Sequence, residues 1–222
     1  MMAEPVLHPT PILELRPTQL TVGMREVAAK RKLWRDREEK PRELVNFLRS
    51  HMVPVILGPK KQRFLIDHHH LALALHEEGA ESVFVTVIAD LHALDDHDFW
   101  NMMEFNGWTH PFDGKGRRRD YSELPQSVVD LEDDPYRSLA GELRAAGGFA
   151  KDTRPFSEFV WADFLRTRIK PKALKGDFDA AFAEAMRLAK SPEANYLPGW
   201  CAAHSAPPSA KKAGKEAAKA AS

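Results

Sequence analysis

The stretch Phe64-Leu65-Ile66-Asp67-His68-His69-His70-Leu71-Ala72-Leu73-Ala74-Leu75 predicts a strand that passes at once into a helix. Residues 64–66 form a short apolar run, typical of a buried strand, and the Leu and Ala residues at 71–75 are good helix formers. Asp67 is placed to cap the start of the helix. The three histidines therefore fall at a strand-to-helix turn, where backbone N–H groups lack partners and the helix dipole favours an anion.

Three interpretations of this turn remain open from the residues alone. The first is a phosphate site, in which the turn amides and histidines bind the anion, Lys61 on the preceding hairpin adds charge, and Asp67 holds Mg²⁺. The second is a transition-metal site made by the histidines, although the HExxH spacing is missing. The third is a capped turn with no chemistry.

Composition excludes several other classes of protein. The chain has 222 residues, 43% of them hydrophobic and 29% charged, with 32 basic against 32 acidic side chains. That balance gives no global charge argument for nucleic acid or a membrane. A single cysteine, Cys201, excludes an internal disulfide framework and a cysteine-based zinc site. No apolar run is long enough to span a bilayer and no signal-peptide pattern precedes Pro11, so we expect a cytoplasmic protein that does not enter a membrane.

Outward from the central turn, the pattern predicts a mixed α+β domain. A strand, a turn, the strand that enters the central turn, a helix and another strand follow one another, which favours a small mixed sheet with helices packed on it. The predicted strands are residues 12–15, 53–58, 63–66 and 82–89. The predicted helices are residues 24–40, 41–51, 68–78, 95–105, 135–146, 156–168 and 178–189.

The end of the chain has a different composition. From Ser205 onward it consists mainly of Ala, Pro, Ser and Lys, which predicts a disordered tail over residues 205–222. We therefore expect one domain over residues 1–204, with additional helices at its C-terminal end.

Four segments, in order, resemble the family named "putative ParB-like nuclease", which has the ParB/sulfiredoxin-like fold. They are Leu15-Arg16-Pro17-Thr18-Gln19-Leu20-Thr21-Val22-Gly23, Asp67-His68-His69-His70-Leu71-Ala72-Leu73-Ala74-Leu75, Asp134-Pro135-Tyr136-Arg137-Ser138-Leu139-Ala140-Gly141 and Gly147-Gly148-Phe149-Ala150-Lys151. The resemblance covers roughly residues 8 to 190. It implies an α+β domain with its ligand site at the strand-to-helix turn, where relatives of this fold bind the phosphates of CTP, ATP or ADP.

The chain departs from the relatives at four positions. His68 stands where they have Gly, and Leu71 stands where they have a phosphate-pairing Arg. Gln19 matches the catalytic Glu of the free serine kinases, and Gln cannot act as a general base. The sulfiredoxin Cys is absent, which rules out sulfiredoxin chemistry by that residue set. His68, His69 and His70, together with Lys61, Arg137 or Lys151, could replace the lost positive charge.

The resulting hypothesis is a ParB-like domain that binds a nucleotide or nucleic acid at Asp67–His70 and acts as a phosphotransferase or nuclease. In it Asp67, His69 and His70 are catalytic, Asp67 is the Mg²⁺ ligand, and the ligand-binding residues are Gln19, Lys61, His68, Arg137 and Lys151. The rival hypothesis is a nucleotide- or DNA-binding module without catalysis. No helix-turn-helix follows residue 120, so a chromosome-partitioning role is not expected.

Overall fold

A computed structural model of the chain describes residues 9–38 and 41–201, and the disordered tail predicted for residues 205–222 lies outside these ranges. Within them the strands form a five-stranded mixed sheet of order β1-β6-β4-β5-β2 and a separate two-stranded sheet of β3 and β7. The strands are β1 (Pro9–Pro11), β2 (Leu15–Pro17), β3 (Thr21–Val22), β4 (Val53–Leu57), β5 (Arg63–Leu65), β6 (Ser82–Asp90) and β7 (Glu132–Asp133).

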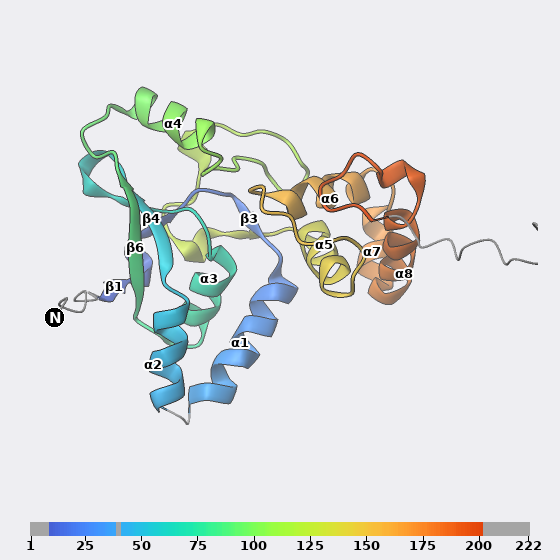
Figure 1. Cartoon of the computed structure of the whole chain (residues 1–222), viewed down its shortest axis with the longest axis horizontal. Coiled ribbons are helices and arrows are strands. Elements are labelled where there is room, and N and C mark those ends of the chain that lie inside the picture. The colour runs from blue at the N-terminus through green and yellow to red at the C-terminus, as the bar shows by residue number, and fades with distance from the viewer. Residues whose placement is uncertain (1–8, 39–40, 202–222) are drawn as a thin grey trace, which may run out of the picture.

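Helices cover both faces of the sheet and extend beyond one of its ends (Figure 1). The helices are α1 (Met24–Glu38), α2 (Pro41–Ser50), α3 (His69–Glu77), α4 (Asp96–Phe105), α5 (Pro135–Ala145), α6 (Ser157–Arg166), α7 (Pro171–Gly176) and α8 (Phe178–Ala189). The mixed α+β class expected from the sequence is therefore confirmed, and so is the hairpin, since β4 and β5 pair antiparallel.

Alternation along the central strands explains the two layers of core. Val55 and Leu65 face the layer that contains α3, whereas Ile56 and Phe64 face Phe99 and the rest of α4. Successive side chains of a strand point to opposite faces, so an uninterrupted apolar run fits a strand buried on both sides. The chain passes from the end of β5 into the central turn, and β5 itself lies between these two layers.

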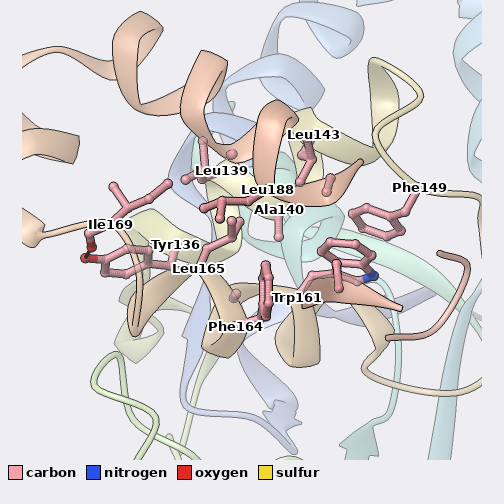
Figure 2. Packing of buried hydrophobic residues seen from close by; sticks show 14 of the residues in the cluster. Tyr136, Leu139, Ala140, Leu143, Phe149, Trp161, Phe164, Leu165, Ile169 and Leu188 are labelled. Carbon is pink, nitrogen blue, oxygen red and sulfur yellow. Dashed lines mark hydrogen bonds between the residues drawn. The ribbon is translucent and has the colours of Figure 1, made fainter. Parts of the chain in front are cut away.

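A third apolar cluster holds the helices α5 to α8 together (Figure 2). Trp161 is fully buried, stacks on Phe149 with 4.2 Å between ring centroids, and donates from Nε1 to the Pro198 carbonyl at 2.7 Å. The OH group of Tyr136 donates to the Ile169 carbonyl at 2.6 Å. The cluster consists mainly of residues from the predicted C-terminal helices and packs α5 against α6 and α8.

The sequence predictions were wrong at three places in these elements. Residues 12–14 form a 3₁₀ turn instead of a strand, since the paired backbone lies on either side of it in β1 and β2. Helix α7 was missed because it has only six residues, with Pro171 at its start and Gly176 at its end. The helix after the central turn begins at His69, one residue later than Asp67 as its N-cap predicts. None of the described helices is long and apolar enough to cross a membrane.

Candidate anion-binding site

A cavity of about 550 Å³ opens at the N-terminal end of α3. Residues of α1, α3, α5 and α6 line it, together with Gln19, the turn before α3, the segment that follows α4 and the loop before α6. We call it the α3 pocket. Its lining residues are Gln19, Glu26, Lys30, Ile66, Asp67, His68, His69, His70, Gly107, Trp108, Arg137, Arg144, Lys151, Asp152, Thr153, Arg154, Pro155, Phe156, Glu158 and Phe159. The strand-to-helix turn identified from the sequence is thus one wall of a cavity.

The turn itself is built around a left-handed residue. His68 has φ 67° and ψ 21° and is the N-cap of α3, but its side chain makes no capping bond. Asp67 is exposed, and its Oδ1 accepts the His68 N–H at 2.6 Å. The prediction that Asp67 caps the helix is therefore wrong, because its carboxylate holds the residue before the first turn and does not reach the amides of that turn.

The start of α3 leaves backbone donors without partners in the helix. The first intrahelical bond runs from the Ala72 N–H to the His68 carbonyl at 2.8 Å. The N–H groups of His69, His70 and Leu71 precede that bond, and no acidic residue lies in the first turn. Such a terminus favours an anion, both through its free donors and through the helix dipole.

The side chains of His69 and His70 do not face an anion at this helix start. They bind the backbone of the neighbouring loop. The N–H of Thr18 donates to Nε2 of His69 at 3.2 Å, and the N–H of Gly23 donates to Nε2 of His70 at 3.0 Å. Both side chains are buried. Two successive residues of α3 therefore fasten both ends of the segment 18–23 to the helix.

These bonds also fix the protonation state of the two rings. Burial lowers the pKa of His69 to about 3, and burial lowers the pKa of His70 well below its ordinary value, with the charge of Arg137 adding to the effect. A neutral imidazole that accepts at Nε2 carries its proton on Nδ1. The nitrogen that an acid or base would use is already occupied, so the geometry does not favour the catalytic roles expected for His69 and His70.

Replacing His68 tests the backbone of the turn. A β-branched side chain is strongly disfavoured at a left-handed φ, whereas glycine adopts it freely. We expect His68→Val to be about 1–2 kcal/mol less stable than His68→Gly, measured by urea unfolding. Equal stabilities of the two variants would show that the turn leaves the left-handed region without cost.

Arg137 on α5 is the buried cation of the pocket. It is 7% exposed, and its Nε and Nη1 have no hydrogen-bond partner among the described residues. Its Nη1 lies 3.3 Å from Oε2 of Glu26, and its guanidinium lies 5.3 Å from the ring centroid of Phe159. A buried guanidinium normally satisfies its donors. Arg137 therefore has hydrogen-bonding capacity left for a ligand.

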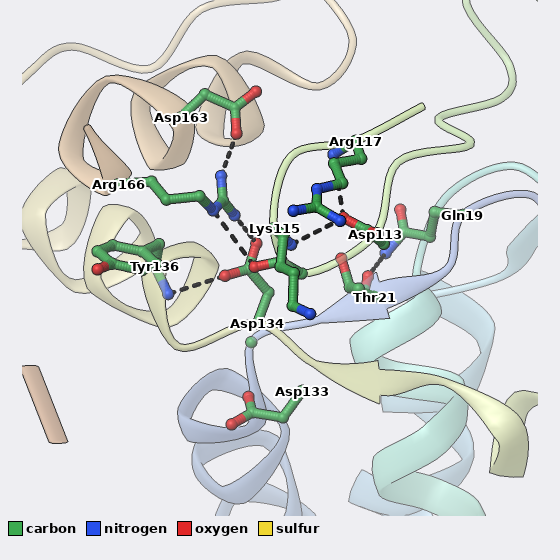
Figure 3. Close-up of polar contacts among 12 residues, drawn as sticks. Gln19, Thr21, Asp113, Lys115, Arg117, Asp133, Asp134, Tyr136, Asp163 and Arg166 are labelled. Atoms are coloured by element: carbon green, nitrogen blue, oxygen red, sulfur yellow. Dashed lines mark hydrogen bonds and ion pairs between the residues drawn. The ribbon is translucent and has the colours of Figure 1, made fainter. Parts of the chain in front are cut away.

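The position of Arg137 depends on a polar cluster at the start of α5 (Figure 3). Asp134 is fully buried, and its Oδ1 accepts the N–H of Tyr136 at 2.9 Å and so caps α5. Its Oδ2 pairs with Nη2 of Arg166 on α6 at 2.5 Å. The Asp134 N–H donates to the Val22 carbonyl at 2.8 Å, which ties the helix to β3. The cap, the ion pair and the strand bond together fix the first turn of α5, which carries Arg137.

The remaining cations of the pocket differ in how firmly they are paired. Arg154 binds both carboxylate oxygens of Asp152, and Arg144 pairs with Glu158 at 2.8 Å. Lys151 lies exposed at the rim and has no ion-pair partner among the described residues. Five cationic side chains thus face four carboxylates in the pocket lining.

The pocket brings together most of the residues singled out from the sequence. Gln19, Asp67, His68, His69, His70, Arg137 and Lys151 all line it. Lys61 does not, because it lies at the tip of the β4–β5 hairpin with φ 57°. The Gln19 side chain donates from Nε2 to the Thr21 carbonyl at 2.7 Å, so it is engaged with its own loop.

Sequence reasoning missed two residues of α1 in this pocket. Glu26 and Lys30 are spaced one helical turn apart, and their side chains lie 3.5 Å apart. The charges of this helix look like a solvated face in the sequence, and no local pattern shows that Glu26 packs against Arg137.

The histidines do not gather into a metal centre. Among the described residues, no group of three or more His, Cys, Asp or Glu side chains is arranged to hold a metal ion. A Mg²⁺ ion that is bound mainly through ligand phosphates needs only one or two carboxylates, and Asp67 and Glu26 are the carboxylates nearest the turn that could serve.

Comparison with known proteins places the chain in a family. The family described as "Putative ParB-like nuclease" matches residues 8–167. Among solved structures, protein Atu1540 from Agrobacterium tumefaciens is similar, with 50% sequence identity and a TM-score of 0.80 over 90% of this chain and 100% of that chain. No curated protein matches the chain.

Proposed function

Because the chain belongs to the putative ParB-like nuclease family, we propose that its α3 pocket binds a phosphate-bearing ligand, a nucleotide or the end of a nucleic acid strand. The observation that carries the proposal is Arg137 at the pocket wall, a guanidinium that is 7% exposed and has two nitrogens without a hydrogen-bond partner among the described residues. Arg is well suited to bind a phosphate through two parallel N–H bonds.

The start of α3 supports the same ligand. The amides that precede Ala72 and the positive end of the helix dipole act on an anion in the pocket from a second direction. In the relatives that the sequence resembles, an Arg stands where this chain has Leu71, and Leu71 is buried in the core. Arg137 on α5 supplies from another element the charge that is missing at position 71.

The other walls of the pocket suit the rest of a nucleotide. Trp108 and Phe156 line it beside the charged residues. Aromatic rings can stack on a base of any identity. A volume of about 550 Å³ is in the range of small-molecule sites.

The proposal concerns binding and assigns no catalytic acid or base. The Nε2 atoms of His69 and His70 accept backbone N–H bonds. A phosphoryl-transfer or phosphodiester-cleaving activity would need a different proton acceptor in the pocket. Mg²⁺ held by Asp67 is part of the proposal, and the Asp67→Ala variant tests it separately.

The proposal is tested by calorimetry and thermal shift with the full chain. The ligands are the common nucleoside mono-, di- and triphosphates and a short single-stranded oligonucleotide with a 5′-phosphate, each with and without Mg²⁺. A ligand of the native state raises the melting temperature once its concentration passes its Kd. We expect at least one of these ligands to bind, and Arg137→Met to weaken its binding about 100-fold.

Arg187→Met is the matched control. Arg187 lies on the exposed side of α8, where it pairs with Glu184, and it does not line the pocket. It should bind the ligand as the native chain does. Binding that Arg137→Met leaves unchanged would contradict the proposal, and so would the absence of binding by all the ligands. Loss of the Mg²⁺-dependent part alone in Asp67→Ala would support Asp67 as the Mg²⁺ ligand.

A further inference from the structure

Glu26 faces the pocket with a carboxylate that the neighbouring side chains hold only loosely. Its Oε2 lies 3.3 Å from Nη1 of Arg137 and 3.6 Å from Nε2 of His70, and its Oε1 lies 3.5 Å from Nζ of Lys30. Among the described residues, none of these contacts has the geometry of a hydrogen bond. The His70 contact adds no charge pairing, because that ring is neutral and its Nε2 already accepts the N–H of Gly23.

A carboxylate in this place conflicts with a bare phosphate. A phosphate bound to Arg137 would lie within a few ångströms of Glu26, and two negative charges at that separation repel each other strongly in a partly buried site. An ionised carboxylate can only accept hydrogen bonds. In the absence of a bridging metal ion, the part of the ligand that meets Glu26 must therefore be a donor.

Resting on the phosphate site proposed above, we infer that Glu26 is a specificity-determining residue. It accepts a hydrogen bond from a hydroxyl group that the ligand carries close to its phosphate, and it disfavours phosphates that lack one. The substrate class is then a phosphate ester of a polyhydroxylated group, such as a ribonucleotide, and inorganic phosphates are excluded. Glu26 belongs to α1 and Arg137 to α5. The hydroxyl group and the phosphate of the ligand are therefore bound by different helices.

A purely structural role of Glu26 would give a different pattern of ligand affinities. If Glu26 only neutralised Arg137, its replacement would change stability without changing which phosphates bind. The discriminating measurement is therefore a ratio of affinities, because a general loss of stability affects both ligands alike.

The test compares the native chain with Glu26→Gln by calorimetry in EDTA. The probes are inorganic pyrophosphate, the four ribonucleoside 5′-monophosphates and their 2′,3′-dideoxy counterparts. We expect Glu26→Gln to bind pyrophosphate about tenfold or more tightly than the native chain does, since the repulsion is removed. We also expect the native chain to prefer a ribonucleotide over its dideoxy counterpart about tenfold, and the variant to show a ratio near one.

Glu158→Gln is the matched control, because Glu158 lines the same pocket but pairs with Arg144. Glu158→Gln should change neither the affinity for pyrophosphate nor the preference for a ribonucleotide over its dideoxy counterpart. An equal rise of pyrophosphate affinity in both variants would overturn the inference, since it would reflect the general field of the pocket. An unchanged ribose preference in Glu26→Gln would overturn it as well. If neither protein bound any probe, the phosphate site itself would fail, whereas binding without discrimination would refute only the role of Glu26.

Discussion

Arg166→Met is expected to destabilise the protein by about 3–5 kcal/mol, the cost of removing one partner from a buried ion pair. The carboxylate of Asp134 is fully buried, and Arg166 is its only cationic partner among the described residues. Burial raises the pKa of Asp134 even with Arg166 present. Without the guanidinium, the charged carboxylate would remain in the interior with no counter-ion.

The loss would extend beyond one contact, because Arg166 joins three parts of the chain. Besides Asp134, it contacts Asp163 on α6, and its Nε donates to the Gly114 carbonyl of the loop at 3.3 Å. Figure 3 shows Arg166 between Asp134 and Asp163, with Lys115 of that loop nearby. Equilibrium urea unfolding, followed by circular dichroism, measures the change in the free energy of unfolding.

Two further variants isolate the ion pair. Asp134→Asn keeps an oxygen that can cap α5 but removes the charge, so the double variant Asp134→Asn/Arg166→Met should be less destabilised than the sum of its single changes. Arg187→Met removes the exposed pair with Glu184 and should cost under about 1 kcal/mol. Strictly additive single effects, or a cost for Arg166→Met as small as that of the control, would contradict the prediction.

The central turn shows how far the sequence could be interpreted. The apolar run at 64–66 and the Leu-Ala run predict a strand and a helix correctly, since burial and helix propensity are local properties. Local pattern cannot show that Asp67 stops one residue short of the cap, because the left-handed φ of His68 decides it. Arg137 lies 69 residues after His68. Only the family resemblance connected it with the turn, since no spacing rule does so.

The two buried histidines illustrate the limit more clearly. His69 and His70 look reactive in the sequence because imidazoles at a helix start suit acid–base chemistry. Their partners are backbone N–H groups of Thr18 and Gly23, about 50 residues away, and only the folded chain brings them together. The sequence did not indicate Glu26 for the same reason, since its contact with Arg137 joins α1 to α5.

The same histidines predict a strong loss of stability in mild acid. Burial lowers the pKa of His69 to about 3 and that of His110 to about 4, and it lowers the pKa of His70 well below its ordinary value. In the unfolded chain all three take up protons below about pH 6.5. Since the unfolded state then binds more protons than the native state, stability falls as the pH decreases.

The size of the effect follows from the same pKa values. His69 and His110 each cost roughly 1.4 kcal/mol per pH unit below about pH 6.5, which amounts to about 2 kcal/mol each at pH 5. His70 adds to the loss in the same direction. Typical domains are stable by only about 5–15 kcal/mol, so the protein should lose a large part of its stability by pH 5. Unfolded carboxyl groups titrate mainly below this window, with pKa values of about 4, so the histidines dominate the slope.

Urea unfolding at half-unit steps from pH 7.5 to pH 5 measures the slope, and His69→Gln assigns it. The Gln side chain offers an oxygen in place of Nε2 to the Thr18 N–H but does not titrate, so the slope should fall by roughly 1.4 kcal/mol per pH unit. His97→Gln, at an exposed position on α4, is the control and should leave the slope unchanged. If His69→Gln kept the full slope, His69 would be able to take up a proton in the native state, and the case against it as an acid or base would fail. A reduced slope would instead establish that His69 stays neutral as the anchor of the segment 18–23, leaving proton transfer to other groups of the pocket.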